Sequence, residues 1–265
     1  MLPLTVWAVL AGILGLAIGS FLNVAIYRVP AGESVVRPPS RCPSCASPIR
    51  NRHNIAVIGW MTLRGRCADC HAPISARYPL IEAATAALFV TITVRMHNLG
   101  MLAALPAYLY LAAAGLTLAM IDIDHKRLPN AIVLPSYLVV GLLLTTASLA
   151  THHWWALGRA AIGGAALFGF YFAIMFAYPA GMGFGDVKLA GVLGGVLAYV
   201  SFSTLVVGAF GGFLLGSIGG LAVLASGRGD RKTAIPFGPF MISAAVLAIL
   251  FGFALEDLYF DALGR

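Results

Sequence analysis

Charged residues are scarce in this chain of 265 residues: only 10% are Asp, Glu, Lys or Arg, whereas 60% are hydrophobic. Soluble domains carry about 25% charged residues. The composition therefore excludes an ordinary soluble domain of this length. A segment in lipid must satisfy its own backbone groups, as an α-helix does. We expect an all-α polytopic membrane protein.

Apolar runs of the length that crosses a bilayer recur along the sequence. A spanning helix needs about 20 residues to cross roughly 30 Å of hydrocarbon. About eight transmembrane helices are predicted, at 5–27, 79–95, 101–121, 131–150, 157–178, 187–202, 204–225 and 237–255. The first is expected to be an uncleaved span, because residues 1–7 lack the basic start of a signal peptide. The predicted domains are the first helix (1–27), a polar insertion (28–78), a seven-helix membrane domain (79–255) and a short tail (256–265).

Positive charge is unevenly distributed among the loops. Fourteen of the 17 lysines and arginines lie in four segments, 28–78, 122–130, 179–188 and 226–236. Cytoplasmic loops retain basic residues, so these segments are predicted to face the cytoplasm and both termini the outside. Basic loops beside an anionic leaflet account for the net charge of +7. We therefore expect contact with membrane lipid and no nucleic-acid partner.

Cysteine is rare, and all of it lies in the polar insertion as C-x2-C-x21-C-x2-C: Cys42, Cys45, Cys67 and Cys70. Each C-x2-C lets two thiolates reach one ion about 2.3 Å away, and two such pairs complete a tetrahedral zinc site. We expect a small cytoplasmic zinc-ribbon-like insertion between helices 1 and 2, stabilised by its metal. A pair of disulfides is the alternative, disfavoured in a reducing compartment. His53 and His71 are expected to be surface residues.

Acidic residues are also few, ten in all. Six fit solvated loops or the tail, and four lie at predicted membrane boundaries: Glu82, Asp122, Asp124 and Asp186. An ionisable group buried at a membrane is costly and suggests function. Asp122 and Asp124 end the third span and Asp186 begins the sixth, so all three are predicted at the cytoplasmic face. Two carboxylates that meet there can hydrolyse an amide, one keeping a proton while the other acts as a base on a shared water.

Simpler roles remain open for these acids. Asp186 is also compatible with an acid in the first turn of its helix, where the helix dipole favours it. Asp122 and Asp124 can instead form ion pairs with Lys126 or Arg127. A dinucleotide site at GMGFGD is excluded, because there is no third glycine at the required spacing and no preceding strand.

Several motifs occur together in the order found in type IV prepilin peptidases. They are GSFLNVAIYRVP, the two cysteine pairs with RGRCADC, RYPLIEAATA, DIDHKRLPN and GMGFGDVKLAG. The chain resembles this family of bifunctional leader peptidases and N-methyltransferases along almost its whole length. One departure is NIAVIGW, at 54–60, which lacks the Pro and Ser of the family pattern.

The resemblance implies an aspartic endopeptidase of the bacterial inner membrane. It would remove the short leader of type IV prepilins and of the pilin-like proteins (pseudopilins) of type II secretion, at the cytoplasmic face. By likeness the catalytic residues are Asp122, eight residues before the Asn that follows Leu-Pro, and Asp186 of GxGD, with Asp124 in reserve. The resemblance also implies N-methylation of the new N-terminus with S-adenosylmethionine, associated with the cysteine segment.

The sequence gives only a weak indication of which residues bind the methyl donor. Glu82 can balance the sulfonium of the donor or the substrate amine, and an ion pair with Arg77 is the alternative. Presenilin-type GxGD proteases also use two membrane aspartates, but this chain resembles them less than it resembles the prepilin peptidases. The non-enzymatic alternative is a transporter or membrane scaffold with a regulatory zinc ribbon. It is disfavoured because the acids lie at span ends rather than near the midplane.

Overall fold

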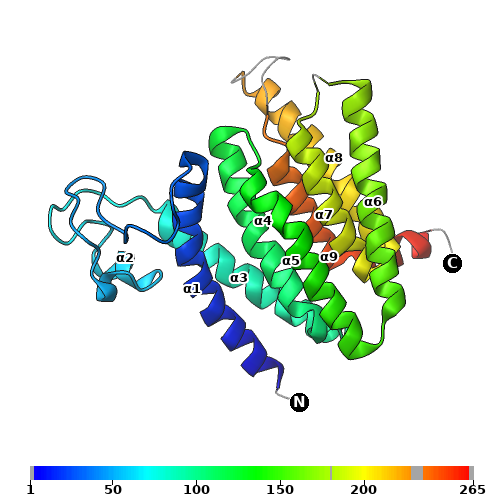
Figure 1. Cartoon of the computed structure of the whole chain (residues 1–265), viewed down its shortest axis with the longest axis horizontal. Coiled ribbons are helices and arrows are strands. Elements are labelled where there is room, and N and C mark those ends of the chain that lie inside the picture. Colours follow the sequence, from blue (N-terminus) through cyan, green and yellow to red (C-terminus); the bar gives the residue numbers. More distant parts are fainter. Residues whose placement is uncertain (1–2, 180, 228–234, 263–265) are drawn as a thin grey trace. The chain divides into compact units, whose positions relative to one another are not determined.

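The computed structural model describes residues 3–179, 181–227 and 235–262, without the side chains of residues 51 and 253–262. Within these ranges the chain is helical, apart from connecting segments and two isolated β-bridges, Arg41 with Pro48 and Arg66 with Pro73. It divides into two compact units, Met1–Asn98 and Leu99–Arg265. Figure 1 shows the helices of both units.

The first unit is a pair of long helices that carries the cysteine segment. The helices are α1 (Leu4–Ala31) and α3 (Arg77–Asn98), and the segment between them contains a 3-10 turn, η1 (Asn51–His53), and the short helix α2 (Ile58–Thr62). Both long helices have the length and hydropathy of membrane spans. The polar insertion predicted between helices 1 and 2 therefore lies between α1 and α3.

Two glycines allow α1 and α3 to pack closely. A Cβ atom at Gly15 would lie 2.6 Å from Ala86 Cα, and one at Gly19 would lie 2.7 Å from Glu82 Cα. Any larger side chain would therefore collide with the backbone of α3. Small residues four apart are typical of tight helix contacts in membranes. The Gly19 contact presses the first turns of α3, which carry Glu82, against α1.

The second unit contains six long helices within its described residues. They are α4 (Leu105–His125), which follows a 3-10 turn η2 (Leu102–Ala104), α5 (Asn130–Thr151), α6 (Trp154–Ala177), α7 (Phe184–Val200), α8 (Phe202–Ala225) and α9 (Gly238–Ala262). With α1 and α3, the helices of the described chain fall on all eight predicted spans. Six of these segments are long and apolar enough to cross a membrane, whereas α7 and the described stretch 238–252 of α9 are shorter.

Helix α7 is shorter than the other long helices of this unit, and other helices surround most of it. Twelve of its 17 residues are buried, and it packs against α5, α6, α8 and α9; Figure 1 shows it beside α6. A Cβ at Gly194 would lie 2.5 Å from the Gly163 carbonyl of α6. A helix of this length spans only about 25 Å. Its first turn carries Asp186, which is thus placed by a helix buried among its neighbours.

Arg159 of α6 caps the far end of α7. Its Nε donates to the Ala198 carbonyl at 2.6 Å, and its Nη2 donates to the Tyr199 and Val200 carbonyls at 2.7 and 2.9 Å. The last carbonyls of a helix have no partner within the helix, and a cation is favourable there. Arg159 is one of three basic residues outside the predicted cytoplasmic loops, and it stabilises the end of α7 by binding these carbonyls.

Candidate active site and metal centre

Asp122 lies in the last turn of α4 and is only 4% exposed. Its Oδ2 accepts a hydrogen bond from the Gly238 N–H at 3.0 Å. Gly238 is the first residue of α9, and the first N–H groups of a helix lack partners within the helix. The contact joins residues 116 apart in the sequence, so the start of α9 orients the Asp122 carboxylate.

Asp186 lies in the first turn of α7 and is partly buried. Its backbone N–H donates to the Gly183 carbonyl at 3.1 Å. The Asp186 carboxylate lies within range of electrostatic interaction with the Asp122 carboxylate and with the Tyr171 hydroxyl. The structure thus brings Asp122 and Asp186 together. The first-turn position is compatible with this pairing, so the simpler interpretation of Asp186 and the catalytic one do not compete.

Leu128 fills the space beside this pair of acids. A Cβ at Gly185 would lie 3.1 Å from Leu128 Cβ, and a Cβ at Gly238 would lie 3.1 Å from Leu128 Cδ2 and 2.8 Å from Asp122 Oδ2. Glycine at both positions therefore lets α7 and α9 begin next to the same leucine. We did not predict Gly238 or Leu128 as site residues; a glycine followed by proline at a helix start is the signal in the sequence.

Asp124 differs from Asp122 in its surroundings. It is exposed, whereas Asp122 is buried, because residues two apart on a helix point in nearly opposite directions. Helix α4 ends at His125. Its C-cap is Lys126, whose φ of 51° is left-handed and whose N–H donates to the Asp122 carbonyl at 2.8 Å. The reserve candidate thus faces away from the pair.

A cavity of about 650 Å³ opens beside the first turn of α7. Apart from Asn130, Tyr137 and Lys188, its lining side chains are apolar and come from α5, α6 and α7. The ammonium of Lys188 contacts Asn130 Oδ1 and lies 5.0 Å from the centre of the Phe184 ring. Tyr137 OH donates to the Lys188 carbonyl at 2.6 Å. Phe184 and Lys188, which lie two residues before and after Asp186, line this cavity. The cavity could therefore hold an apolar segment of a substrate close to Asp186.

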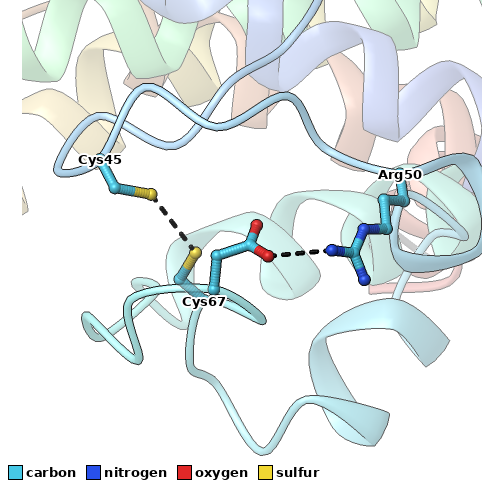
Figure 2. Close-up of polar contacts among 4 residues, drawn as sticks. Cys45, Arg50 and Cys67 are labelled. Carbon is cyan, nitrogen blue, oxygen red and sulfur yellow. Dashed lines mark hydrogen bonds and ion pairs between the residues drawn. The ribbon is translucent and has the colours of Figure 1, made fainter.

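The four cysteines of the first unit form a cluster that can hold a metal ion. Their sulfur atoms all lie within 4.8 Å of one another. Cys42 and Cys70 have sulfurs 3.8 Å apart, and Cys45 and Cys67 have sulfurs 4.0 Å apart, a pair that Figure 2 shows pointing toward one another. A tetrahedral zinc site with bonds of about 2.3 Å has sulfurs about 3.8 Å apart. The cysteines are free rather than disulfide-bonded, so the geometry fits a tetrahedral ion.

Each cysteine pair sits on the same local fold. The N–H of Cys42 donates to the Ser47 carbonyl and that of Cys67 to the Ala72 carbonyl, both at 2.9 Å. We did not predict this repeat, although the sequence carries it as R-C-x2-C-x2-P-I at 41–49 and 66–74. Arg50 and Asp69 also form an ion pair at 3.0 Å, drawn in Figure 2, which is largely exposed and so contributes little stability. Neither His53 nor His71 belongs to the described metal cluster.

The thiols influence one another strongly. Hydrogen bonding with Ser47 lowers the pKa of Cys45 to about 6. For Cys70, hydrogen bonding with Ala72 lowers the pKa, but the neighbouring thiols and burial outweigh it and raise the pKa to about 12. Four thiolates this close repel one another. A bound dication would offset that repulsion, and metal binding would release the remaining protons.

Glu82 anchors the cysteine segment to the helix pair. It is 8% exposed, and its Oε2 accepts a hydrogen bond from the Val57 N–H at 2.6 Å. Val57 has φ 61° and ψ −51°, and the Ile58 N–H donates to the Ala56 carbonyl at 2.6 Å, which together define the rare, strained form of γ-turn. A β-branched residue in such a conformation costs on the order of 1–3 kcal/mol and persists only where its surroundings enforce it. Here the Glu82 carboxylate supplies part of that enforcement.

Comparison with known proteins covers most of the chain. Residues 13–96 match the bacterial peptidase A24 N-terminal domain, and residues 109–221 match the type IV leader peptidase family. Three curated proteins called prepilin leader peptidase/N-methyltransferase are similar to the chain. That of Stutzerimonas stutzeri is 34% identical, over 93% of this chain and 91% of its own length. That of Aeromonas hydrophila is 35% identical, over 92% and 90%. That of Pseudomonas aeruginosa is 32% identical, over 95% and 93%.

No solved structure gives a significant match. The first match spans most of the α1–α3 unit and the second spans α4 to most of α8, so the two units of the structure correspond to the two matched segments in order. Identity above 30% over nine-tenths of each chain leaves no ambiguity about kinship. The chain belongs to the type IV leader peptidase family.

Proposed function

We propose that this protein is a membrane endopeptidase that removes the short leader from type IV prepilins and pseudopilins and then methylates the new N-terminal amine. The observation that carries the peptidase proposal is that Asp122, in the last turn of α4, and Asp186, in the first turn of α7, lie on either side of Leu128. The relatives are named for both activities, and this chain matches them over nearly their full length. The comparisons lend no support to a transporter or scaffold.

The two aspartates act as one acid–base pair. Two carboxylates this close do not ionise together comfortably, so one keeps a proton. The ionised member takes a proton from a water molecule as the water oxygen adds to the scissile carbonyl carbon. The protonated member donates its proton to the carbonyl oxygen, and a proton returned to the amide nitrogen lets the C–N bond break. Burial of Asp122 and the Gly238 hydrogen bond hold one partner in a fixed orientation.

The cysteine cluster holds a structural zinc ion. Cys42, Cys45, Cys67 and Cys70 supply four soft sulfur ligands at tetrahedral spacing, which is typical of zinc. Four protein ligands fill the shell and leave no open position for a substrate, so the ion stabilises the fold. This segment has a small apolar core, and a metal is the usual supplement for such a domain.

The protein resides in the inner membrane with its catalytic face toward the cytoplasm. Fourteen of the 17 basic residues lie in loops assigned to that side. The ends of α4 and the start of α7, which carry the aspartates, lie in or beside those loops. The apolar cavity next to Asp186 suits a hydrophobic pilin segment that approaches through lipid.

The test is the intact mass of a prepilin incubated with the purified protein and S-adenosylmethionine. We expect the wild type to remove the leader and add one methyl group, whereas Asp122→Asn and Asp186→Asn remove none. Asp124→Asn is the matched control, because its side chain is exposed and faces away from the pair; it should cleave normally. Ample cleavage by Asp122→Asn together with inactivity of Asp124→Asn would make the reserve candidate the catalytic residue.

A further inference from the structure

The cysteine segment exposes a row of apolar side chains with an arginine at each end. Ile55, Ile58 and Met61 follow one another at intervals of three residues and are 52%, 56% and 63% exposed. Arg52 and Arg64 continue the same interval at the two ends, and both are exposed. Single exposed apolar residues are ordinary, but a group of them marks a surface that another molecule covers. We call these five residues the arginine-flanked row.

The opposite side of α2 faces the rest of the cysteine segment. Trp60 donates from Nε1 to the Ile74 carbonyl at 3.0 Å, and Gly59 is buried. The Gly59 N–H donates to the Ile55 carbonyl at 2.7 Å, so Ile55 belongs to the same compact turn as α2. The two members of the row within α2 are three residues apart and therefore share a face of the helix. The row thus forms the outer side of a small folded unit.

A hydrogen bond holds this row at the level of the membrane boundary. The N–H of Val57, between Ile55 and Ile58, donates to Glu82 Oε2 at 2.6 Å. Glu82 lies five residues after Arg77, the first residue of α3, and α3 has the length and hydropathy of a membrane span. Five residues of helix rise about 8 Å, and the headgroup layer on each side of the hydrocarbon is roughly 5–8 Å thick. The row is therefore held at the depth of lipid headgroups.

The ends of both long helices carry the side chains that are typical of this layer. Tyr27 and Arg28 lie near the end of α1, and Arg77 and Tyr78 lie at the start of α3. The two tyrosines are largely exposed. Tyrosine is enriched at membrane–water interfaces, and arginine extends its charged group toward them. The segment that carries the row is thus attached to the headgroup layer at both of its ends.

The charge of the segment fits an anionic surface. Residues 28–78 contain eight arginines and two acidic residues, Glu33 and Asp69. Asp69 is paired with Arg50 at 3.0 Å, so the segment cannot neutralise its other arginines. Anionic headgroups attract basic residues that lie beside a membrane span, and the guanidinium group matches the geometry of phosphate. Apolar side chains flanked by arginines are the pattern of a segment that lies on a bilayer surface.

We propose that the arginine-flanked row binds the anionic phospholipids of the leaflet beside the cysteine segment. Ile55, Ile58 and Met61 enter the boundary between headgroups and acyl chains, while Arg52 and Arg64 bind lipid phosphates on either side of them. The contact holds the cysteine segment against the membrane surface. This lipid-binding surface goes beyond the enzymatic function proposed above and does not depend on it.

The experiment is site-specific photocrosslinking of the full-length protein in lipid nanodiscs. A diazirine-bearing amino acid replaces Met61, and the nanodiscs contain phosphatidylcholine with or without phosphatidylglycerol. Mass spectrometry of the segment then measures the yield of lipid adducts. We expect lipid adducts in a higher yield with phosphatidylglycerol. Arg52→Gln combined with Arg64→Gln should lower that yield at least about fivefold, because each basic residue near an anionic surface contributes roughly a fivefold preference.

The matched control is Arg50→Gln in the same nanodiscs. Arg50 is an exposed arginine of the same segment, but its charge is already paired with Asp69, so its lipid adducts should equal those of the unsubstituted arginines. Zinc content is measured in every sample, since a retained ion shows that the cysteine segment is folded.

Three results would overturn the proposal. A zinc-loaded protein without lipid adducts in either bilayer would show that the row faces water. Adducts to an added prepilin in place of lipid would make the row a docking surface for a protein. Lipid adducts that respond neither to phosphatidylglycerol nor to the loss of Arg52 and Arg64 would exclude recognition of anionic headgroups. Cleavage and methylation of prepilin are assayed separately, so a failure of the lipid contact is distinguished from a failure of the enzymatic function.

Discussion

At the scale of single residues, Gly238 fixes the orientation of the Asp122 carboxylate through its N–H. We predict that Gly238→Ala lowers the rate of leader cleavage about 10–100-fold in a folded protein. The added Cβ would lie 2.8 Å from Asp122 Oδ2, so the carboxylate must move, and a shift of about 1 Å at a catalytic group costs on the order of 10²-fold. Cleavage kinetics with a prepilin measure this effect.

The matched control for that substitution is Gly141→Ala. Gly141 lies in α5, and a Cβ there meets nothing within 4 Å. Alanine is also the better helix former, so cleavage and stability should equal or exceed those of the wild type. A Gly238→Ala protein as active as Gly141→Ala would show that the Asp122 orientation tolerates the displaced side chain.

The difference between Asp122 and Gly238 also marks what a sequence can predict about this site. Asp122 stands out because acids are rare and costly in a membrane chain. Gly238 is one of 30 glycines, and its role arises only when α9 starts beside the end of α4. The strained turn at Val57 also could not be predicted from its local sequence, NIAVIGW. It is stabilised by a hydrogen bond from the Val57 N–H to Glu82, which lies 25 residues away in the sequence.

At the scale of elements, the cysteine segment depends on its ion. We predict that Cys45→Ser, or prolonged treatment of the wild type with a strong chelator, releases one zinc ion per chain and unfolds residues 28–78 while the helices persist. Three thiolates leave the tetrahedral shell incomplete, and metal binding in such small domains is folding free energy. Metal analysis and protease sensitivity of the segment are the measurements. Ser44→Ala, between the two cysteines of the first pair, is the control. A Cys45→Ser protein with full zinc content would refute the four-thiolate site.

The pair α1 and α3 depends on the glycines between them. We predict that Gly15→Ala and Gly19→Ala each destabilise the first unit by about 1–3 kcal/mol, the usual cost of overpacking, because both added atoms would meet the backbone of α3. Thermal unfolding in detergent measures the loss. Gly12→Ala is the control on the same helix: its Cβ would meet only the end of the Val90 side chain, at 3.3 Å. If all three variants melt alike, close backbone contact does not hold this pair together.

At the scale of the whole molecule, hydropathy predicts all eight long helices but not how deeply each is buried. Continuous apolar runs suffice for the number and order of the long helices, six of which are long and apolar enough to cross a membrane. They do not distinguish α7, which other helices enclose, from α8, of which only three residues are buried. Glycine is frequent in both, so composition alone cannot separate a buried helix from one that faces lipid. That distinction depends on contacts such as Gly163 with Gly194, which only the folded chain defines.

The distribution of basic residues makes the orientation of the whole molecule testable. We predict that the loop after α4 faces the cytoplasm and the turn after α5 faces the outside, because lysines and arginines are retained on the cytoplasmic side. His125→Cys and His153→Cys report the two sides, since both histidines are exposed at helix ends. An impermeant maleimide should label His153→Cys in intact spheroplasts and His125→Cys only after lysis. The wild type, with its four cysteines in the cytoplasmic insertion, should remain unlabelled until lysis. The reverse pattern would put the aspartate pair on the outer face, where a leader that stays in the cytoplasm cannot reach it, and the peptidase proposal would fall with the orientation.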